Sequence, residues 1–98
     1  MSVTILKYIL KDKVENRGYE QHVKIDMPRS AEILKIDECE GKLVAWAKVN
    51  LSLPPEIRHF VLYGDEQMMP AKHGHYCGTV QMNNQKIIFH VFDKGNIL

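Results

Sequence analysis

The sequence predicts an all-β fold, a small antiparallel sandwich or barrel of about seven strands. Apolar and polar residues alternate with a period of two over most of the chain, which is the pattern of half-buried strands. Segments rich in Gly, Asn, Asp and Pro separate these stretches, as turns do between short strands. A chain of 98 residues has room for one core, so we expect a single β domain over residues 1–98.

The first three strands are expected over residues 3–10, 19–27 and 31–38. Pro28 ends the second strand because proline has no N–H to donate to a sheet. The charged and polar residues 11–18 predict a hairpin loop between the first two strands. Residues 31–38 fit neither period perfectly; we favour a strand and expect at most one short helix, near residues 30–34.

Four more strands are expected over residues 43–49, 58–63, 76–82 and 86–92. Residues 39–42 predict a tight turn, and Pro54 and Pro55 predict a loop over 51–56. Asn83, Asn84 and Gln85 predict a turn before the last strand.

Large apolar side chains of these later strands define the expected core. Trp46 and Phe89 are both expected there. Residues 86–92 are apolar on both faces apart from Lys86 and His90, so this strand is expected in the centre of a sheet. His90 itself is expected to bond to a backbone carbonyl, because buried polar groups are normally satisfied.

Composition excludes several classes of protein. The chain is 45% hydrophobic and 26% charged with a formal net charge of +1, which argues against disorder and against a dedicated nucleic-acid binder. No window approaches the roughly 18 apolar residues of a membrane span. Lysines interrupt the first apolar stretch, so it does not read as a signal peptide. Two cysteines exclude a disulfide framework, although one bridge is arithmetically available, and we expect a cytoplasmic location.

The segment from His73 to Cys77 is the sharpest chemical feature of the sequence. In an extended strand His73, His75 and Cys77 would point the same way, and imidazole and thiolate are zinc ligands. Cys39 or His90 would be the candidate fourth ligand. The alternative, which we favour, is a polar strand edge with Cys77 packed inside, so no metal or cofactor is expected.

Cys77 also has a catalytic interpretation. Paired with His59, His75 or His90, its thiol could act as a nucleophile with an adjacent base. No recognisable motif surrounds the thiol, and a buried free cysteine commonly serves as a small apolar side chain.

The longest irregular segment, residues 65–74, carries two adjacent methionines and a proline. Such a loop is either an adaptable apolar contact surface or a plug that folds back over one end of the sandwich. We predict a partner-binding surface formed by this loop together with the strand that leads into it. Its residues are Arg58, His59, Asp65, Glu66, Met68, Met69 and His73.

Several short segments, in this order, resemble a family of short uncharacterised proteins of bacteriophages and prophages. They are Ile5-Leu6-Lys7-Tyr8, Met27-Pro28 with Ala31-Glu32-Ile33-Leu34, Trp46-Ala47, and finally Tyr63-Gly64, Gly78-Thr79-Val80 and Phe89-His90-Val91-Phe92. Family members often carry a Thr-Gly-His-like run after the Tyr-Gly pair, where this chain has Asp65-Glu66-Gln67. The resemblance implies a small phage accessory protein acting inside a bacterial cell, and it supplies no reaction or ligand.

These observations leave three classes of function. The first is a non-enzymatic phage protein that binds a host macromolecule, for example to inhibit a bacterial defence system. The second is a protein that sequesters a small ligand, such as a nucleotide signal, in a pocket between the two protomers of a homodimer. The third is a small enzyme that uses Cys77 and a histidine.

Overall fold

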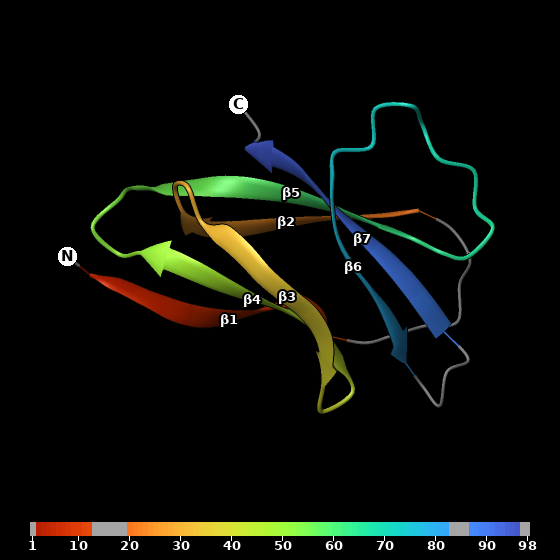
Figure 1. Ribbon diagram of the computed structural model, residues 1–98, viewed down its shortest axis with the longest axis horizontal. Coiled ribbons are helices and arrows are strands. Elements are labelled where there is room, and N and C mark those ends of the chain that lie inside the picture. Colours follow the sequence, from red (N-terminus) through yellow and green to blue (C-terminus); the bar gives the residue numbers. More distant parts are fainter. Residues whose placement is uncertain (1, 13–19, 83–86, 97–98) are drawn as a thin grey trace.

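The computed structural model describes residues 2–12, 20–82 and 87–96 and confirms the all-β prediction (Figure 1). Its seven strands form two antiparallel sheets, and the described residues contain no helix. The strand order is β1-β4-β3 in sheet A and β2-β5-β7-β6 in sheet B. The strands are β1 (Val3–Lys11), β2 (Gln21–Pro28), β3 (Glu32–Cys39), β4 (Lys42–Asn50), β5 (Pro55–Tyr63), β6 (His75–Met82) and β7 (Ile87–Asn96).

The core lies between the two sheets and is built from alternate residues of each strand. As the alternation predicts, β4 contributes Leu43, Ala45, Ala47 and Val49 to it. Sheet B contributes inward residues of β5, β6 and β7, among them Phe89, which is 2% exposed as predicted. The prediction that the last strand is central also holds, since β7 lies between β5 and β6.

One long side of the sandwich is closed by contact between β3 and β6, the edge strands of the two sheets. Gly78 of β6 makes this close approach feasible. A Cβ atom at Gly78 would lie 3.4 Å from the Cβ of Ile36, which is tighter than most such contacts. A side chain at this position would have to displace Ile36 of β3 by a few tenths of an ångström.

The turn predicted between residues 39 and 42 joins β3 to β4 in a hairpin. Glu40 and Gly41 have φ values of 53° and 79°, as expected for the central residues of a type I′ turn. This turn type matches the twist of the two strands, which explains why Cys39 and Lys42 pair directly.

The predicted hairpin of the first two strands is wrong. β1 pairs with β4 and β2 pairs with β5, so the chain passes from sheet A to sheet B between them. A polar loop sequence favours a turn but cannot specify which strands it joins, because pairing depends on long-range contacts. Residues 13–19 of this connection, and the turn predicted over 83–85, lie outside the described residues.

Two strand boundaries also differ from the prediction, the start of β5 and the end of β7, which continues to Asn96 rather than ending at residue 92. β5 begins at Pro55, within the segment expected to be a loop, and Pro55 pairs with Pro28 at the end of β2. A first strand position tolerates proline because no ladder hydrogen bond from its nitrogen is required there. The short helix allowed near residues 30–34 is absent; Ser30, with φ of 64°, turns the chain into β3.

Trp46 does not lie in the core, contrary to the prediction. It stands on the outward side of β4, between the inward-facing Ala45 and Ala47, and is partly exposed. The Nζ atom of Lys7 lies 5.7 Å from the centre of its ring, a cation–π distance. A side chain's size indicates burial, but alternation decides which side of the sheet it occupies.

No helix of the described residues is long and apolar enough to cross a membrane.

Candidate functional site

The outward side of sheet B carries a second apolar cluster beneath the loop of residues 64–74. Val61, Tyr63 and Phe92 are at most 8% exposed although they face away from the main core. The Phe92 ring centre lies 4.7 Å from His73, 5.4 Å from Tyr76 and 5.6 Å from Tyr63. Burial and the nearby Glu20 carboxylate raise the pKa of Tyr63, so its hydroxyl stays protonated at neutral pH.

A glycine fixes the end of this loop against the sheet. Gly74 has a φ of 89°, and a Cβ atom there would lie 2.6 Å from the carbonyl oxygen of Asp93. Only glycine combines this backbone conformation with such a close approach. The loop therefore returns to β7 before it enters β6, and His73 is brought onto the Phe92 ring.

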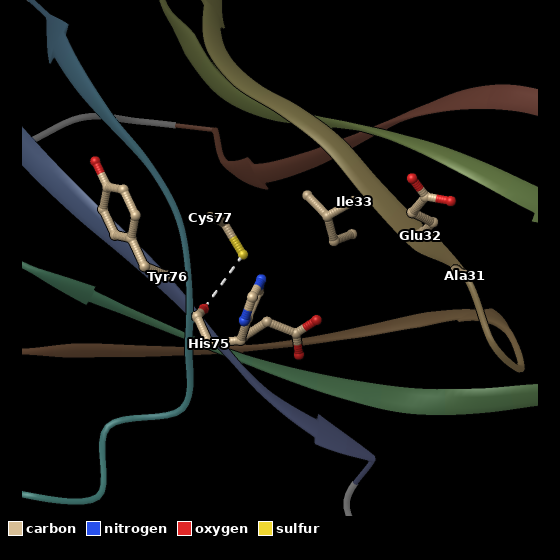
Figure 2. A pocket seen from close by; sticks show the side chains of 7 residues that line it. Ala31, Glu32, Ile33, His75, Tyr76 and Cys77 are labelled. Atoms are coloured by element: carbon tan, nitrogen blue, oxygen red, sulfur yellow. Dashed lines mark hydrogen bonds between the residues drawn. The ribbon is translucent and has the colours of Figure 1, made fainter.

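A β-bulge at Cys77 changes which residues of β6 face outward. The pairing with β7 shifts between Tyr76 and Gly78, so that Tyr76 is opposite Phe92 and Gly78 is opposite Val91. Tyr76 and Thr79 then share the outward side, where their hydroxyl groups are hydrogen-bonded. Figure 2 shows Tyr76 on one side of β6 and Cys77 on the other.

The convergence of His73, His75 and Cys77 that the zinc interpretation requires is not formed. His73 lies before the strand and packs on Phe92 on the outward side, whereas His75 and Cys77 line a cleft at the other side of β6. Residues at i, i+2 and i+4 point the same way only within a regular strand, and here the loop end and the bulge at Cys77 interrupt it. Among the residues that the structure describes, no three His, Cys, Asp or Glu side chains gather as a metal site would require.

A chain of hydrogen bonds crosses the outward side from β6 to the loop. His90 Nε2 lies 2.9 Å from Asp65 Oδ1, and His90 Nδ1 lies 2.9 Å from the Thr79 hydroxyl oxygen. Because a carboxylate only accepts, the His90 Nε2–H donates to Asp65, and the Thr79 hydroxyl is hydrogen-bonded both to His90 Nδ1 and to the Tyr76 hydroxyl. His90 was expected to bond to a backbone carbonyl; instead it joins side chains of β6 and the loop.

The tip of the loop presents its methionines to solvent. Met68 is 90% exposed and Met69 is 38% exposed. Beside them, the Gly64 N–H donates to Gln67 Oε1 at 2.8 Å, and Glu66 adopts a positive φ of 60°. The sequence left open whether the loop is a contact surface or a plug; the structure shows how the loop lies on the sheet, and a contact with a partner stays a prediction. The ends of the loop cover the sheet, and its tip is free. We call residues 64–74 with Tyr63, Tyr76, Thr79, His90 and Phe92 the loop face.

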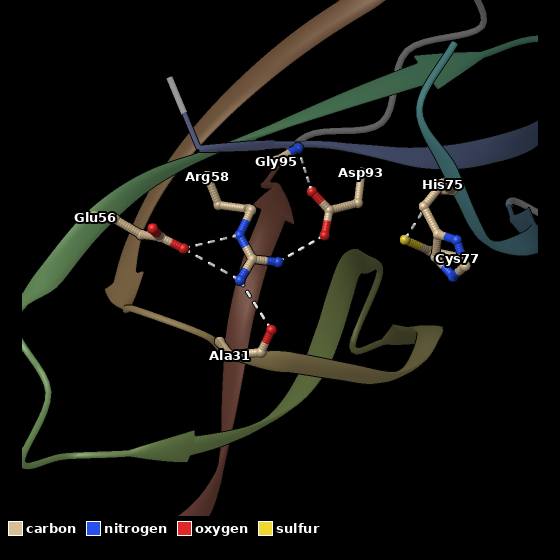
Figure 3. A network of polar contacts seen from close by, with 7 residues as sticks. All are labelled: Ala31, Glu56, Arg58, His75, Cys77, Asp93 and Gly95. Atoms are coloured by element: carbon tan, nitrogen blue, oxygen red, sulfur yellow. Dashed lines mark hydrogen bonds and ion pairs between the residues drawn. The ribbon is translucent and has the colours of Figure 1, made fainter. Parts of the chain in front are cut away.

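Arg58, which the sequence placed in the partner-binding surface, is buried at the other end of β5 (Figure 3). Its Nη1 donates to Asp93 at 2.6 Å and its Nη2 donates to the Ala31 carbonyl at 2.8 Å. Glu56 lies 3.3 Å from Nη2 and is also about 10% exposed at its side chain. The arginine thus ties β5 and β7 to the start of β3 and has no free donor facing outward.

His59 faces outward, yet it lies four residues from Tyr63 along β5, roughly 13 Å from the loop face. Its Nε2 lies 2.7 Å from His22 Nδ1, and the two rings are stacked. His22 also contacts the Glu20 carboxylate. Burial, followed by the positive charges of His22, Lys94 and Lys24, lowers the pKa of His59. This histidine pair is therefore separate from the loop face.

The cleft at the other side of β6 has a volume of about 260 Å³ and is lined by residues of β3, β6 and β7, with His75, Cys77, Glu32 and Asp93 as its polar groups. Burial and the Asp93 carboxylate raise the pKa of the Cys77 thiol to about 11. At neutral pH the thiol is protonated, and a thiol attacks far more slowly than a thiolate. The geometry therefore does not favour Cys77 as a nucleophile. Both cysteines are free.

Of the residues nominated from the sequence, the structure gathers Asp65, Glu66, Met68, Met69 and His73 on the loop face, and it separates Arg58 and His59 from them. Sequence reasoning missed Tyr76, Thr79 and Phe92. The available signal was Gly78, because a glycine inside a strand pattern often marks a bulge. A bulge at that point brings Tyr76 and Thr79 to one side.

Comparison with models of protein families identifies the family of this chain. The model of a domain of unknown function, DUF7352, matches residues 1–96. The chain belongs to the DUF7352 family. No curated protein and no solved structure matches it significantly. Membership in DUF7352 agrees with the uncharacterised family that the sequence segments resemble, and it assigns no activity.

Proposed function

We propose that this DUF7352 protein is a non-enzymatic binding protein that engages a protein partner through its loop face. The observation that carries the proposal is the contrast within one loop. Its ends are held by the Gly74–Asp93 approach and the Asp65–His90 hydrogen bond, while Met68 at its tip is 90% exposed. Because both ends of the loop are anchored, its backbone has less conformational freedom to lose on binding.

The chemistry of the loop face fits a protein partner. Methionine is a flexible, polarisable side chain that adapts to apolar pockets at interfaces. Charged groups lie beside it, namely Asp65, Glu66 and Lys72, all exposed. An apolar centre with a charged rim is the usual make-up of a protein interface. In the phage setting that the sequence resemblance implies, the partner would be a host protein, for example a component of a defence system.

An enzymatic role is less well supported. The hydrogen-bonded chain of Asp65, His90 and Thr79 has the residue types of a hydrolase triad. However, Thr79 also bonds to Tyr76 and stands on the outward side of a sheet, and neither Thr79 nor His90 lines the cleft beside β6. The chain therefore serves best as a brace that holds the loop.

A small-ligand role is the second candidate, and the 260 Å³ cleft beside β6 is the observation in its favour. Its volume is at the lower limit for a drug-sized ligand. Of its two carboxylates, Asp93 is paired with Arg58, whereas Glu32 is exposed and would repel the phosphates of a nucleotide signal. If the cleft binds anything, a small cation-bearing ligand fits better than a nucleotide.

The test compares two double-serine variants. Met68→Ser with Met69→Ser removes the apolar tip of the loop face. Leu51→Ser with Leu53→Ser changes two residues of another loop that are 54% and 37% exposed, and serves as the matched control. Bacterial proteins captured by the wild-type chain are purified, and each is then titrated calorimetrically against wild type, the loop variant and the control.

We expect the loop variant to bind its partner at least about tenfold more weakly than the control, as loss of an apolar anchor does. If both variants bind equally well, the loop face is not the binding site. Native mass spectrometry of freshly purified protein tests the second candidate, because a resident small ligand adds a fixed mass that the loop variant retains.

A further inference from the structure

The two sheets have four edges, and three of them are protected. β3 and β6 cover each other, and each carries a bulge, between Ile33 and Lys35 in β3 and at Cys77 in β6. β2 presents a polar outward row of His22, Lys24 and Asp26, and ends at Pro28. Bulges, charges, prolines and covering strands are the devices by which proteins prevent pairing at a sheet edge. The fourth edge is β1.

β1 carries little of this protection along its first seven residues. Val3, Ile5, Leu6 and Ile9 are 46%, 58%, 37% and 44% exposed, and Lys7 is the sole charge from residue 3 to residue 9. Its one bulge comes at the end of the strand, between Ile9 and Lys11. A shallow hollow of about 460 Å³, lined by Val3, Thr4, Ile5 and Lys48, lies along its first half. Such an edge is a template for another strand.

The backbone hydrogen bonds show which groups of β1 are free. The Leu51 N–H donates to the Ser2 carbonyl at 2.8 Å, and Val3 pairs with Asn50. In an antiparallel ladder, hydrogen-bonded pairs alternate with non-bonded pairs, so Ser2, Thr4, Leu6 and Tyr8 bond to β4. The N–H and C=O groups of Val3, Ile5, Lys7 and Ile9 therefore point away from β4, toward the free edge.

We propose that β1 pairs antiparallel with β1 of a second copy of the chain, with the two-fold axis at Ile5. Ile5 would then lie opposite Ile5 of the second copy, and Val3 opposite Lys7. The resulting sheet continues through both copies in the order β3-β4-β1-β1-β4-β3.

Charge placement selects this register. Odd-numbered residues must face each other, because they carry the free backbone groups. With the axis at Lys7, two ammonium groups would stand opposite each other, which destabilises a strand pair. With the axis at Leu6, the two lysines would be diagonal neighbours about 7–8 Å apart. With the axis at Ile5, the two lysines are farther apart than in either of these registers, and Ile5, the apolar residue of the strand with the largest exposed fraction, is buried at the centre.

The position of the free N–H groups supplies a specific variant. Within the part of the chain that the structure describes, the N–H of residue 5 has no backbone partner in β4. Ile5→Pro should therefore leave the β1–β4 ladder intact and remove one bond to the second copy from each chain. Ile5→Lys is a second variant, which places like charges opposite each other without altering the backbone. Leu34→Lys is the matched control, because Leu34 is 45% exposed on β3, the other edge of sheet A.

Analytical ultracentrifugation of the full chain, from micromolar to millimolar concentration, measures the assembly. We expect wild type and Leu34→Lys to reach twice the chain mass of 11.4 kDa. Both Ile5 variants should dissociate at least ~10-fold more readily. Circular dichroism checks that all four proteins are folded. A wild-type chain that stays monomeric at millimolar concentration overturns the proposal, as does a dimer that survives both Ile5 variants.

Amide hydrogen exchange separates edge pairing from any other dimer. The Leu6 and Tyr8 amides should be protected at every concentration, because they bond to β4. The Ile5 and Lys7 amides should exchange quickly in the monomer and gain protection only as the dimer forms. A dimer in which these two amides still exchange quickly would show that its interface lies elsewhere.

Discussion

The outward sides of the two sheets differ in how far their apolar side chains are exposed to solvent. On sheet B, Val61, Tyr63 and Phe92 are at most 8% exposed, because the loop of residues 64–74 returns over them. On sheet A, Val3, Ile5 and Ile9 remain 44–58% exposed. The same alternating pattern therefore gives a loop-covered apolar cluster on sheet B and exposed apolar side chains along β1 on sheet A. Sheet B presents the anchored loop of residues 64–74 on its outward side. Sheet A ends in the unpaired edge strand β1.

This difference separates two kinds of interaction. A shaped loop on an anchored base favours a partner with a matching pocket, whereas a bare edge favours another extended strand. Because the loop face belongs to sheet B and the proposed pairing to sheet A, a dimer would carry two free loop faces. Two linked sites raise the apparent affinity for a partner that is itself multimeric.

The largest expected effect compares one aromatic residue from each outward side. Phe92→Ala should lower the free energy of unfolding by roughly 3 kcal/mol, because the ring is 8% exposed and its loss leaves a cavity under the loop. Trp46→Ala should cost about 1 kcal/mol, since that ring is partly exposed beside Lys7. Urea unfolding followed by circular dichroism measures both. Equal losses would mean that the loop does not shield sheet B.

A second prediction concerns the anchor of the loop. Gly74→Ala should destabilise the protein by about 2–3 kcal/mol, because it combines a positive φ with a Cβ atom 2.6 Å from the Asp93 oxygen. Gly41→Ala is the matched control. Its φ of 79° is similar, but nothing lies within 4 Å, so only the backbone cost of about 1 kcal/mol is expected. The difference between the two variants measures the close approach alone, by thermal or urea unfolding. Equal values would contradict it.

The sequence predicted the strands better than it predicted their partners. Alternation predicted the inward residues of β4 correctly, because the apolar and polar residues within one segment indicate which side of the strand is buried. The pairing of β1 with β4 was missed, since a loop sequence does not record which distant strand is adjacent. For the same reason, the sequence predicted only part of the candidate site. Met68 and Met69 are visible as a loop feature, whereas the meeting of Asp65 with His90, 25 residues apart, is visible only in the fold.

Burial of Arg58 shows a further limit of local pattern. The residue precedes the loop in an apolar strand, where a charged side chain is expected to face solvent. It faces the interior instead, because Asp93 and Glu56 supply opposite charges there. Two of its three partners lie on other elements, Asp93 on β7 and Ala31 just before β3. No spacing in the sequence brings these three residues together.

A third prediction uses pH to probe the polar end of sheet B. The pKa of His59 lies below its ordinary value of 6.5 in the folded protein, so the unfolded chain takes up this proton first as pH falls. Stability should therefore decrease as pH falls below about 6.5 and level off once the folded His59 is also protonated. In His59→Gln this component disappears. Urea unfolding of both proteins between pH 7 and pH 5 tests it, and an identical pH dependence would contradict the assignment.

The smallest expected effect concerns the open side of sheet A. Lys7 lies 5.7 Å from the centre of the Trp46 ring on neighbouring strands, at an exposed site where a cation–π contact contributes about 0.5–1 kcal/mol. Lys7→Gln should therefore lower stability by no more than that amount, while the emission of this single tryptophan changes because a charge has left its ring. Lys48→Gln is the control, since Lys48 lies two residues along β4 and its side chain is exposed on the same side. If Lys48→Gln changes the emission as much as Lys7→Gln, the contact between Lys7 and the ring is not specific.

The Lys7→Gln variant also tests the register of the proposed β1–β1 pairing. Under the proposed register Lys7 lies opposite Val3 of the second copy, so removing its charge should leave the dimer intact. In a register with the two lysines opposite each other, removing the charge would strengthen the dimer. Ultracentrifugation of Lys7→Gln beside wild type therefore distinguishes the two registers by the direction of the change.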